Sequence, residues 1–256
     1  MDQFSLKGNT AVITGGARGL GFAFAEALAE AGANITILDI GTPQLGSLQT
    51  LAMKHSVKLE AYKVDVTSRE QVNQVVETIE KEFGSVDVNI NAAGVVTDEP
   101  FLTTSDKDLS SIFNANFVGS FLVAQACANA MVRKWEKIDK PKPQDAPLIG
   151  SIILISSVAT HISTMAQQIS CYTVSKAAVR GLVKPFAMEL AQYGIRVEKT
   201  FPDLLKQFNQ ESMFGRVGEP DELKPAILYL AASTWTTGQD LLVDGGVSSW
   251  KHRGNW

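Results

Sequence analysis

A short apolar run, followed at once by a glycine-rich turn and a helix-forming segment, constrains the fold of this chain most strongly. Residues 10–14, Thr-Ala-Val-Ile-Thr, have the β-branched, apolar character of a buried strand. The turn carries Gly15, Gly19 and Gly21, and residues 22–29 form helices readily. Glycines let the backbone approach a pyrophosphate, and a helix N-terminus offers free N–H groups. We predict a phosphate-binding turn; because the spacing is Gly-x-x-x-Gly-x-Gly, the alternative is a turn without a ligand.

The second predicted strand, residues 34–38, leads directly into a carboxylate. Asp39 follows Gly21 by eighteen residues. In a dinucleotide fold, an acid at this strand tip hydrogen-bonds the adenosine ribose. It would also repel a 2′-phosphate. The sequence therefore favours NAD(H), with NADP(H) as the alternative because Arg18 could attract a phosphate; a further alternative is that Asp39 caps the next turn.

Tyr172 and Lys176 are candidates for a proton-transferring pair. Their spacing of four residues puts the phenol and the ammonium on one face of a helix, one turn apart. A free tyrosine has a pKa of about 10, and a nearby cation lowers that pKa by favouring the phenolate. The pair is therefore a candidate general acid/base. Taken alone, the same spacing is also typical of a solvated helix face.

Strands and helices alternate along the chain. This alternation predicts a single-domain, Rossmann-type α/β fold, a doubly wound parallel sheet with helices on both faces. The further strands are expected at 58–64, 86–90, 151–155, 195–199 and 240–243, and the helices at 44–54, 69–83, 106–134, 172–193 and 221–232. A hydrophilic, proline-containing insert at 134–149 is expected to be an exposed loop.

Chemically informative residues fall just after the predicted strands. Ligands of open parallel sheets bind beyond the carboxyl ends of the strands, so these residues should share one edge. They are Gly15, Asp39, Asp65, Asn91, Ser157 and Pro202. Small residues in the segment 91–94, Asn-Ala-Ala-Gly, would let a cofactor approach the backbone. The alternatives are a tight turn for that segment and a turn-capping role for Asp65.

Five motifs, in this order, resemble the short-chain dehydrogenase/reductase family. They are Thr14-Gly-Gly-Ala-Arg-Gly-Leu-Gly21, Asp65-Val66, Asn91-Ala92-Ala93-Gly94, Asn116 and Tyr172-x-x-x-Lys176. The match runs from Leu6 to Gly246, and the segment from Ile155 to Tyr172 is similar to that of fungal polyol and carbonyl reductases. The resemblance implies reversible hydride transfer between C4 of a nicotinamide and a carbonyl or secondary-alcohol carbon.

The resemblance also implies a role for each motif residue. Tyr172 would exchange the proton, and Lys176 would lower its pKa and hold the nicotinamide ribose. Asn116 would hold a water chain leading to Lys176, with a surface or capping asparagine as the alternative. Asp65 and Val66 would contact the adenine. The expected dinucleotide-binding residues are Gly15, Arg18, Gly19, Leu20, Gly21, Asp39, Asp65, Val66, Asn91, Ala92, Ala93, Gly94, Tyr172 and Lys176; no metal ligand is expected.

The catalytic serine departs from the family pattern. The family places it about thirteen residues before the tyrosine, where this chain has Ala159, whereas Ser157 lies fifteen residues before Tyr172. We assign Ser157 to the substrate oxygen, with Ser156 as the alternative. Both could instead satisfy backbone groups at the strand end. His161, in the same loop, is a weaker candidate for substrate contact.

The substrate lid of the family is shortened in this chain. Where relatives have a Pro-Gly turn and a mobile lid, Thr200 is followed by Phe201-Pro202-Asp203, and aspartate cannot replace a glycine in glycine-only backbone regions. One explanation is a deletion within 200–215 that leaves the site open to a bulky substrate. The other, which we favour because such lids are mobile, is that lid residues are missing from the printed sequence. The Cα distance between Thr200 and Phe201 would separate these explanations.

Composition narrows the partners. A net charge of −4, with basic and acidic residues interspersed, argues against nucleic acid. Cys127 and Cys171 lack metal or disulfide spacing, which fits a reducing compartment. No apolar run approaches ~20 residues and no signal region opens the chain, so we expect a cytoplasmic protein without a membrane partner. The resemblance implies a small-molecule substrate and a homotetramer or dimer.

Two other functions remain open at this point. One is a family member recruited to secondary metabolism, with an added redox-neutral or tandem activity. The other is a binding protein that senses nucleotides without turnover. Turnover of a ketone panel with NADH and NADPH would distinguish both from a reductase.

Overall fold

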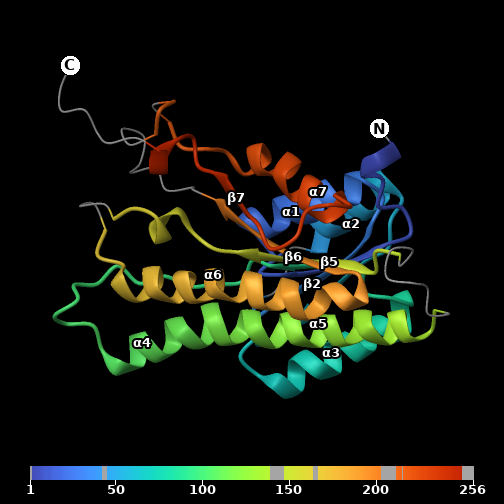
Figure 1. Ribbon diagram of the computed structural model, residues 1–256, viewed down its shortest axis with the longest axis horizontal. Coiled ribbons are helices and arrows are strands. Elements are labelled where there is room, and N and C mark those ends of the chain that lie inside the picture. Colours follow the sequence, from blue (N-terminus) through green and yellow to red (C-terminus); the bar gives the residue numbers. More distant parts are fainter. Residues whose placement is uncertain are drawn as a thin grey trace.

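The computed structural model describes residues 2–41, 45–138, 147–163, 167–202, 212–214 and 216–249 (Figure 1). The strands are β1 (Thr10–Thr14), β2 (Asn34–Asp39), β3 (Leu59–Lys63), β4 (Val88–Asn91), β5 (Gly150–Ile155), β6 (Ile195–Pro202) and β7 (Asp240–Val243). The α-helices are α1 (Gly19–Glu30), α2 (Leu45–His55), α3 (Arg69–Phe83), α4 (Asp106–Phe113), α5 (Gly119–Glu136), α6 (Ser170–Leu190) and α7 (Lys224–Ala232).

The strands form one seven-stranded parallel sheet in the order β3-β2-β1-β4-β5-β6-β7. The order reverses direction between β1 and β4, which is where an open α/β sheet binds its ligand. In the register, Thr14 is opposite both Leu38 and Asn91, and Ile155 is opposite Thr200. The strand ends are therefore level, and the residues that follow them meet at one edge. The predicted single-domain, doubly wound α/β fold is confirmed.

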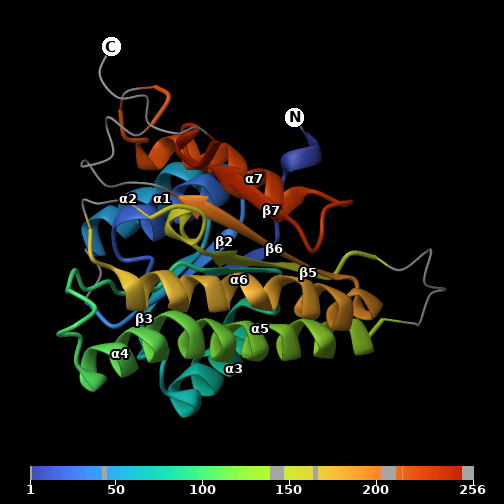
Figure 2. The ribbon, with the colours of Figure 1, turned by 60° about the vertical axis from the view of Figure 1, so that its left-hand side comes forward.

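Helices cover both faces of the sheet, and each face has its own apolar core. On one face α3, α5 and α6 pack around a cluster that includes Val76, Val123 and Val179. On the other face α1, α2 and α7 enclose a cluster that includes Phe24 and Ile227. Figures 1 and 2 show these two layers on opposite sides of the strands. Because both faces are covered, the inner strands β1, β2, β4 and β5 are nearly continuous runs of buried residues, whereas the edge strands β3 and β7 are partly exposed.

Local signals fix several helix ends. The Ser68 side chain accepts a hydrogen bond from the Gln71 backbone N–H at the start of α3, and Gly84 ends that helix in the left-handed conformation. Ser105 caps α4 in the same way, through the backbone N–H of Asp108. The predicted helix 69–83 and strand 240–243 have the observed bounds.

The prediction of one continuous helix at 106–134 differs from the structure. A π-helical turn, Asn114–Val118, separates α4 from α5, and such turns are frequent at functional sites. The whole stretch Asp106–Glu136 is long and apolar enough to cross a membrane by length and composition alone. However, 61% of its most apolar window is buried within the fold, which is the pattern of a core helix.

Strand β6 is longer than predicted. It continues through Thr200 and Phe201 to Pro202, and Phe201 and Pro202 pair with Leu242 and Val243 of β7. This pairing does not test either explanation of the short lid, and both stay predictions. The predicted shortened lid falls largely on 203–211 and Gly215, and most of the predicted insert falls on 139–146; these residues lie outside the described part of the chain.

Candidate active site

The glycine turn packs tightly against the end of β4. Gly15 has φ +66°, a left-handed conformation that favours glycine, and a Cβ there would lie 2.9 Å from the Ala93 backbone. A Cβ on Gly21 would lie only 2.3 Å from the Gly15 carbonyl oxygen. Thr14 Oγ1 accepts a hydrogen bond from the Ala93 backbone N–H, 3.0 Å away. The turn therefore has the bare backbone that a pyrophosphate requires, at the start of α1.

Asp39 lies beside this turn and is hydrogen-bonded to it. One carboxylate oxygen accepts from the Ala17 backbone N–H at 3.0 Å, and the other accepts from the Gly41 N–H at 2.9 Å. The carboxylate therefore holds the turn in place and also caps the end of β2, as the alternative prediction allowed. Arg18 is exposed next to it, at the N-terminus of α1.

The ends of β3 and β4 supply the next two predicted motifs. Asp65 accepts hydrogen bonds from both the backbone N–H and the hydroxyl of Thr67, which is a turn-capping arrangement. Val66 packs close to Gly119. Asn91 is buried, its amide donates to Asn89 Oδ1, and its own Oδ1 has no hydrogen-bond donor among the described residues. A buried acceptor of this kind fits a site that a bound group completes.

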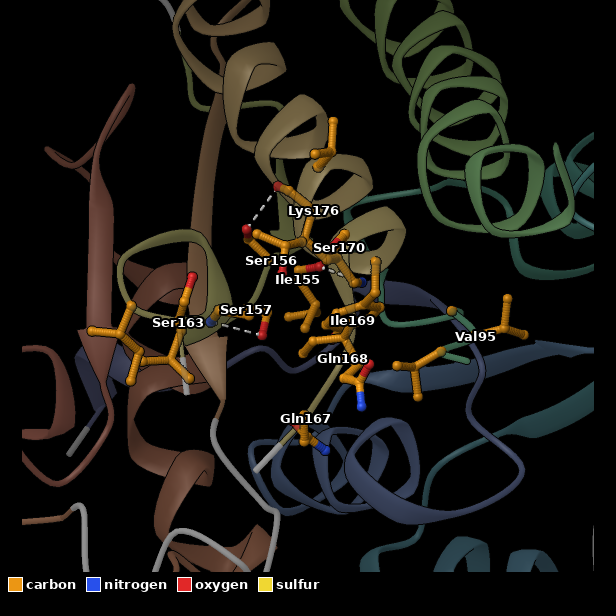
Figure 3. A pocket seen from close by; sticks show the side chains of 18 of the residues that line it. Val95, Ile155, Ser156, Ser157, Ser163, Gln167, Gln168, Ile169, Ser170 and Lys176 are labelled. Atoms are coloured by element: carbon orange, nitrogen blue, oxygen red, sulfur yellow. Dashed lines mark hydrogen bonds between the residues drawn. The ribbon is translucent and has the colours of Figure 1, made fainter. Parts of the chain in front are cut away.

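A cavity of about 540 Å³ opens beyond the ends of β4 and β5. Its walls include Leu20 from the first turn of α1, Gly94, Ser157, and both Tyr172 and Lys176 of α6. Figure 3 shows Lys176, Ser156 and Ser157 converging on it from α6 and from the segment after β5. The structure thus brings the predicted acid/base pair to one cavity with the start of α1, the helix that begins at the glycine turn.

Lys176 is buried but held by specific contacts. Its side chain is 4% exposed, and Nζ donates to the Ile155 carbonyl oxygen at 2.9 Å. Nζ lies 5.8 Å from the centre of the Tyr172 ring, as expected for side chains one helical turn apart. Burial disfavours the ammonium form and lowers the pKa of Lys176 to about 8. A group with that pKa responds to pH in the physiological range.

Asn116 lies on the π-helical turn and is fully buried. Its Oδ1 accepts from the Val95 backbone N–H at 2.7 Å, and its Nδ2 donates to the Val95 carbonyl and to Ser175 Oγ, both at 2.9 Å. A Cβ on Gly94 would lie 3.0 Å from Asn116 Oδ1 and 3.3 Å from Lys176 Nζ. The amide and the ammonium are therefore neighbours, and the alternative of a surface asparagine does not apply.

The two candidate serines differ in their contacts. Ser156 is buried, and its hydroxyl donates to the Lys176 backbone carbonyl at 2.9 Å. Ser157 accepts from the Ala159 backbone N–H at 3.2 Å, so that bond leaves its own hydroxyl proton available. Both border the cavity. This geometry favours Ser157 over Ser156 as the group that meets a substrate oxygen.

Sequence reasoning missed Ser175 and Val95, which fix the Asn116 amide. No sequence signal identifies them, because Val95 contributes backbone atoms and Ser175 bonds to Asn116 from another helix. His161 is exposed and is absent from the described cavity lining. Within the described residues, no cluster of three or more His, Cys, Asp or Glu side chains could hold a metal ion.

Comparison with known proteins places this geometry in context. Residues 15–248 match a family model described as enoyl-(acyl carrier protein) reductase. A sorbose reductase of Candida albicans is 35% identical, over 96% of this chain and 89% of its own. A probable NADP-dependent mannitol dehydrogenase of Yarrowia lipolytica is 34% identical, over 96% and 90%. The crystal structure of NADPH-dependent 3-quinuclidinone reductase from Rhodotorula rubra matches with a TM-score of 0.86 at 32% identity, over 96% and 93%.

Fold, site and relatives together define a nicotinamide-dependent oxidoreductase of carbonyl or alcohol compounds. The chain belongs to the short-chain dehydrogenase/reductase family and resembles the fungal polyol reductases within it.

Proposed function

We propose that the chain interconverts a carbonyl compound and the corresponding secondary alcohol, with Tyr172 as the proton donor in the direction of reduction. The observation that carries this proposal is the convergence of the Tyr172 ring, Lys176 Nζ and the Asn116 amide beside Gly94, at one cavity. A bound nicotinamide dinucleotide supplies the hydride. The glycine turn fits such a group, as does Asn91 Oδ1, which has no donor among the described residues.

The protein's own groups divide the remaining work. The Tyr172 hydroxyl gives its proton to the substrate oxygen, and the Ser157 hydroxyl donates a hydrogen bond that orients the same oxygen. The Lys176 ammonium stabilises the resulting phenolate and binds ribose hydroxyls. Asn116 holds the Val95 backbone and Ser175 in place beside Lys176. We propose that water held there returns the proton to Tyr172 by way of Lys176.

The direct test is turnover. Purified protein would be mixed with NADH or NADPH and a panel of ketones, and the absorbance of the reduced dinucleotide would be followed. Oxidation that depends on both ketone and protein is expected. Dinucleotide binding without turnover would instead favour a nucleotide sensor, and product formation without net oxidation would favour a redox-neutral activity.

Replacement of Gly21 by alanine is expected to weaken dinucleotide binding about tenfold, because the turn must shift to make room for the new side chain. The new Cβ would lie 2.3 Å from the Gly15 carbonyl oxygen, and overpacking of this kind costs about 1–3 kcal/mol, where 1.4 kcal/mol is a factor of ten. Fluorescence titration with reduced dinucleotide would measure the affinity. Gly181→Ala is the matched control, because nothing lies within 4 Å of a Cβ at that position on α6. Equal affinities in both variants would contradict the role of the turn.

We propose NAD(H) as the preferred dinucleotide, with NADP(H) as the alternative. The carboxylate of Asp39, fixed against the turn, supports NAD(H). The NADP-linked names of two relatives, and the exposed Arg18, favour NADP(H). We choose NAD(H) because the Asp39 carboxylate would repel the 2′-phosphate of NADP(H).

Replacement of Asp39 by alanine is expected to lower the ratio of NADPH to NADH dissociation constants about tenfold. The variant loses the proposed hydrogen bond from the ribose to the carboxylate, and a hydrogen bond to a charged group contributes about 1.5–3 kcal/mol. Dissociation constants for both dinucleotides would be measured in parallel. Asp39→Asn keeps an acceptor for the Ala17 N–H but removes the charge, so it separates repulsion from support of the turn. Tighter NADPH binding by the unmodified protein would overturn the preference.

We further propose a homodimer or homotetramer that is cytoplasmic and takes a small-molecule substrate. Large apolar side chains that α4 and α6 expose, Leu109, Val174 and Met188, support association through these helices. Measurement of the molecular mass in solution would give the oligomeric state, and a monomeric mass at micromolar concentration would contradict this proposal.

A further inference from the structure

One polar side chain at the cavity has no assigned task. Gln167 belongs to the cavity wall in the segment just before α6. Its Oε1 has almost no exposed surface and no hydrogen-bond donor among the described residues. A buried amide oxygen without a donor costs free energy. Gln167 is therefore set up to receive a donor that the described residues do not supply.

The segment that carries Gln167 is anchored on its outer side. The Gln168 backbone N–H donates to Asp98 Oδ1 at 2.7 Å, and the Gln168 carbonyl accepts from the Glu99 N–H at 2.9 Å. Figure 3 shows Gln167 and Gln168 together beside the cavity, close to the start of α6. The Gln167 backbone is thereby fixed next to the residues that lead to Tyr172. A fixed polar group determines specificity better than a mobile one.

The charge of the cavity limits what can enter it. Among the described residues of its wall, Lys176 is the one with a full charge, and Nζ is already bonded to the Ile155 carbonyl. The other polar side chains there are neutral hydroxyls and amides, such as Ser157, Ser163 and Thr173. A carboxylate or phosphate on the substrate would have no dedicated partner among these residues. Neutral polar groups suit a neutral, hydroxylated molecule.

We propose that Gln167 binds a hydroxyl of the substrate other than the reacting oxygen, and so selects uncharged hydroxylated ketones and the corresponding polyols. This inference rests on the proposed reductase function. A hydroxyl can donate to Oε1 and accept from Nε2, and the soft terminal torsion of the side chain lets the amide present either atom. A site built to bond a substrate hydroxyl rejects the analogue that lacks it.

The test compares a ketohexose with 2-hexanone, which has the same carbon chain but only the carbonyl oxygen. Gln167→Leu removes both amide atoms at nearly constant volume. We expect kcat/KM for the ketohexose to fall about tenfold, mostly through KM, with 2-hexanone unchanged. Gln74→Leu is the matched control, because Gln74 is an exposed glutamine on α3 and does not belong to the described cavity wall. The control variant should leave kcat/KM unchanged for both ketones.

A binding arm separates this inference from the proposed function. NMR titration of the ketohexose and its polyol, without turnover, should show weaker binding by Gln167→Leu even if the unmodified protein turns over no ketone. Selective binding without turnover would overturn the reductase proposal and support the role of Gln167. An equal loss for both ketones, an equal effect of Gln74→Leu, or a loss confined to dinucleotide affinity would overturn the role of Gln167.

Discussion

Replacement of Tyr172 by phenylalanine is expected to lower the turnover of ketone reduction at least ~100-fold, because general acid catalysis contributes about 10²–10⁴. The ring, its packing on α6 and the nearby Lys176 are retained, and only the hydroxyl that donates the proton is lost. Dinucleotide affinity should therefore stay within about twofold of the unmodified protein, since no bond of the glycine turn changes. Steady-state rates and fluorescence titration would measure the two quantities separately.

Tyr229→Phe is the matched control for the loss of a phenolic hydroxyl. Tyr229 lies on α7, is 42% exposed, and bonds through its hydroxyl to Thr236 Oγ1. Its replacement should leave turnover unchanged. If Tyr172→Phe retained near-normal turnover, another group would have to supply the proton, and the assignment of Tyr172 would be wrong.

The parts of the fold that were predicted correctly depend on local rules. Residues 69–83 carry a serine cap, a helical apolar period and a terminal glycine, and these signals act within a few residues of one another. The π-helical turn at Asn116 has no comparable signal. The contacts made there, Gly119 with Val66 and Asn116 with Ser175, join residues that are distant in sequence.

Strand β6 illustrates a second limit. Its sequence places Arg196, Glu198 and Lys199 in a strand, and charged side chains normally mark an exposed position. In the structure Glu198 bonds to Arg196 at 2.7 Å and Lys199 pairs with Asp240 at 3.0 Å. Glu198 and Lys199 are fully buried. Burial raises the pKa of Glu198 to about 7. Arg196 and Glu198 pair within β6, but Arg196 also donates to the Leu230 and Ala231 carbonyls of α7, and Asp240 belongs to β7. These contacts with other elements make the burial possible, and no local pattern in the sequence indicates them.

The candidate site divides in the same way. The spacing of Tyr172 and Lys176 follows from helix geometry alone, so it was predictable. The difference between Ser156 and Ser157 was not, because it depends on which hydroxyl reaches the Lys176 carbonyl across the gap between β5 and α6. The roles assigned to these residues stay predictions until variants are measured.

Replacement of Lys176 by methionine is expected to reduce turnover at least ~100-fold and also to weaken dinucleotide binding. Methionine keeps the length of the side chain but removes the charge and the donor to the Ile155 carbonyl. The phenolate of Tyr172 would lose its stabilising cation, and the ribose would lose a partner. Two proposed roles disappear together, so this variant differs from Tyr172→Phe by its effect on affinity.

The pH profile gives Lys176 a signature of its own. Because its pKa is about 8 in the folded protein, the ammonium is present below that pH and is lost as the pH rises through it. We expect kcat/KM for the reduced dinucleotide, which reports free-enzyme groups, to fall above about pH 8. The methionine variant should lack this step. Folding has the opposite dependence: the unfolded chain binds more protons between about pH 8 and 10.5, so the contribution of Lys176 to stability rises with pH there.

Lys184→Met, on the exposed face of α6, is the control and should leave the turnover rate and its pH profile unchanged. A variant at Lys176 with normal affinity and the same pH step would assign that step, and the ribose contact, to other groups.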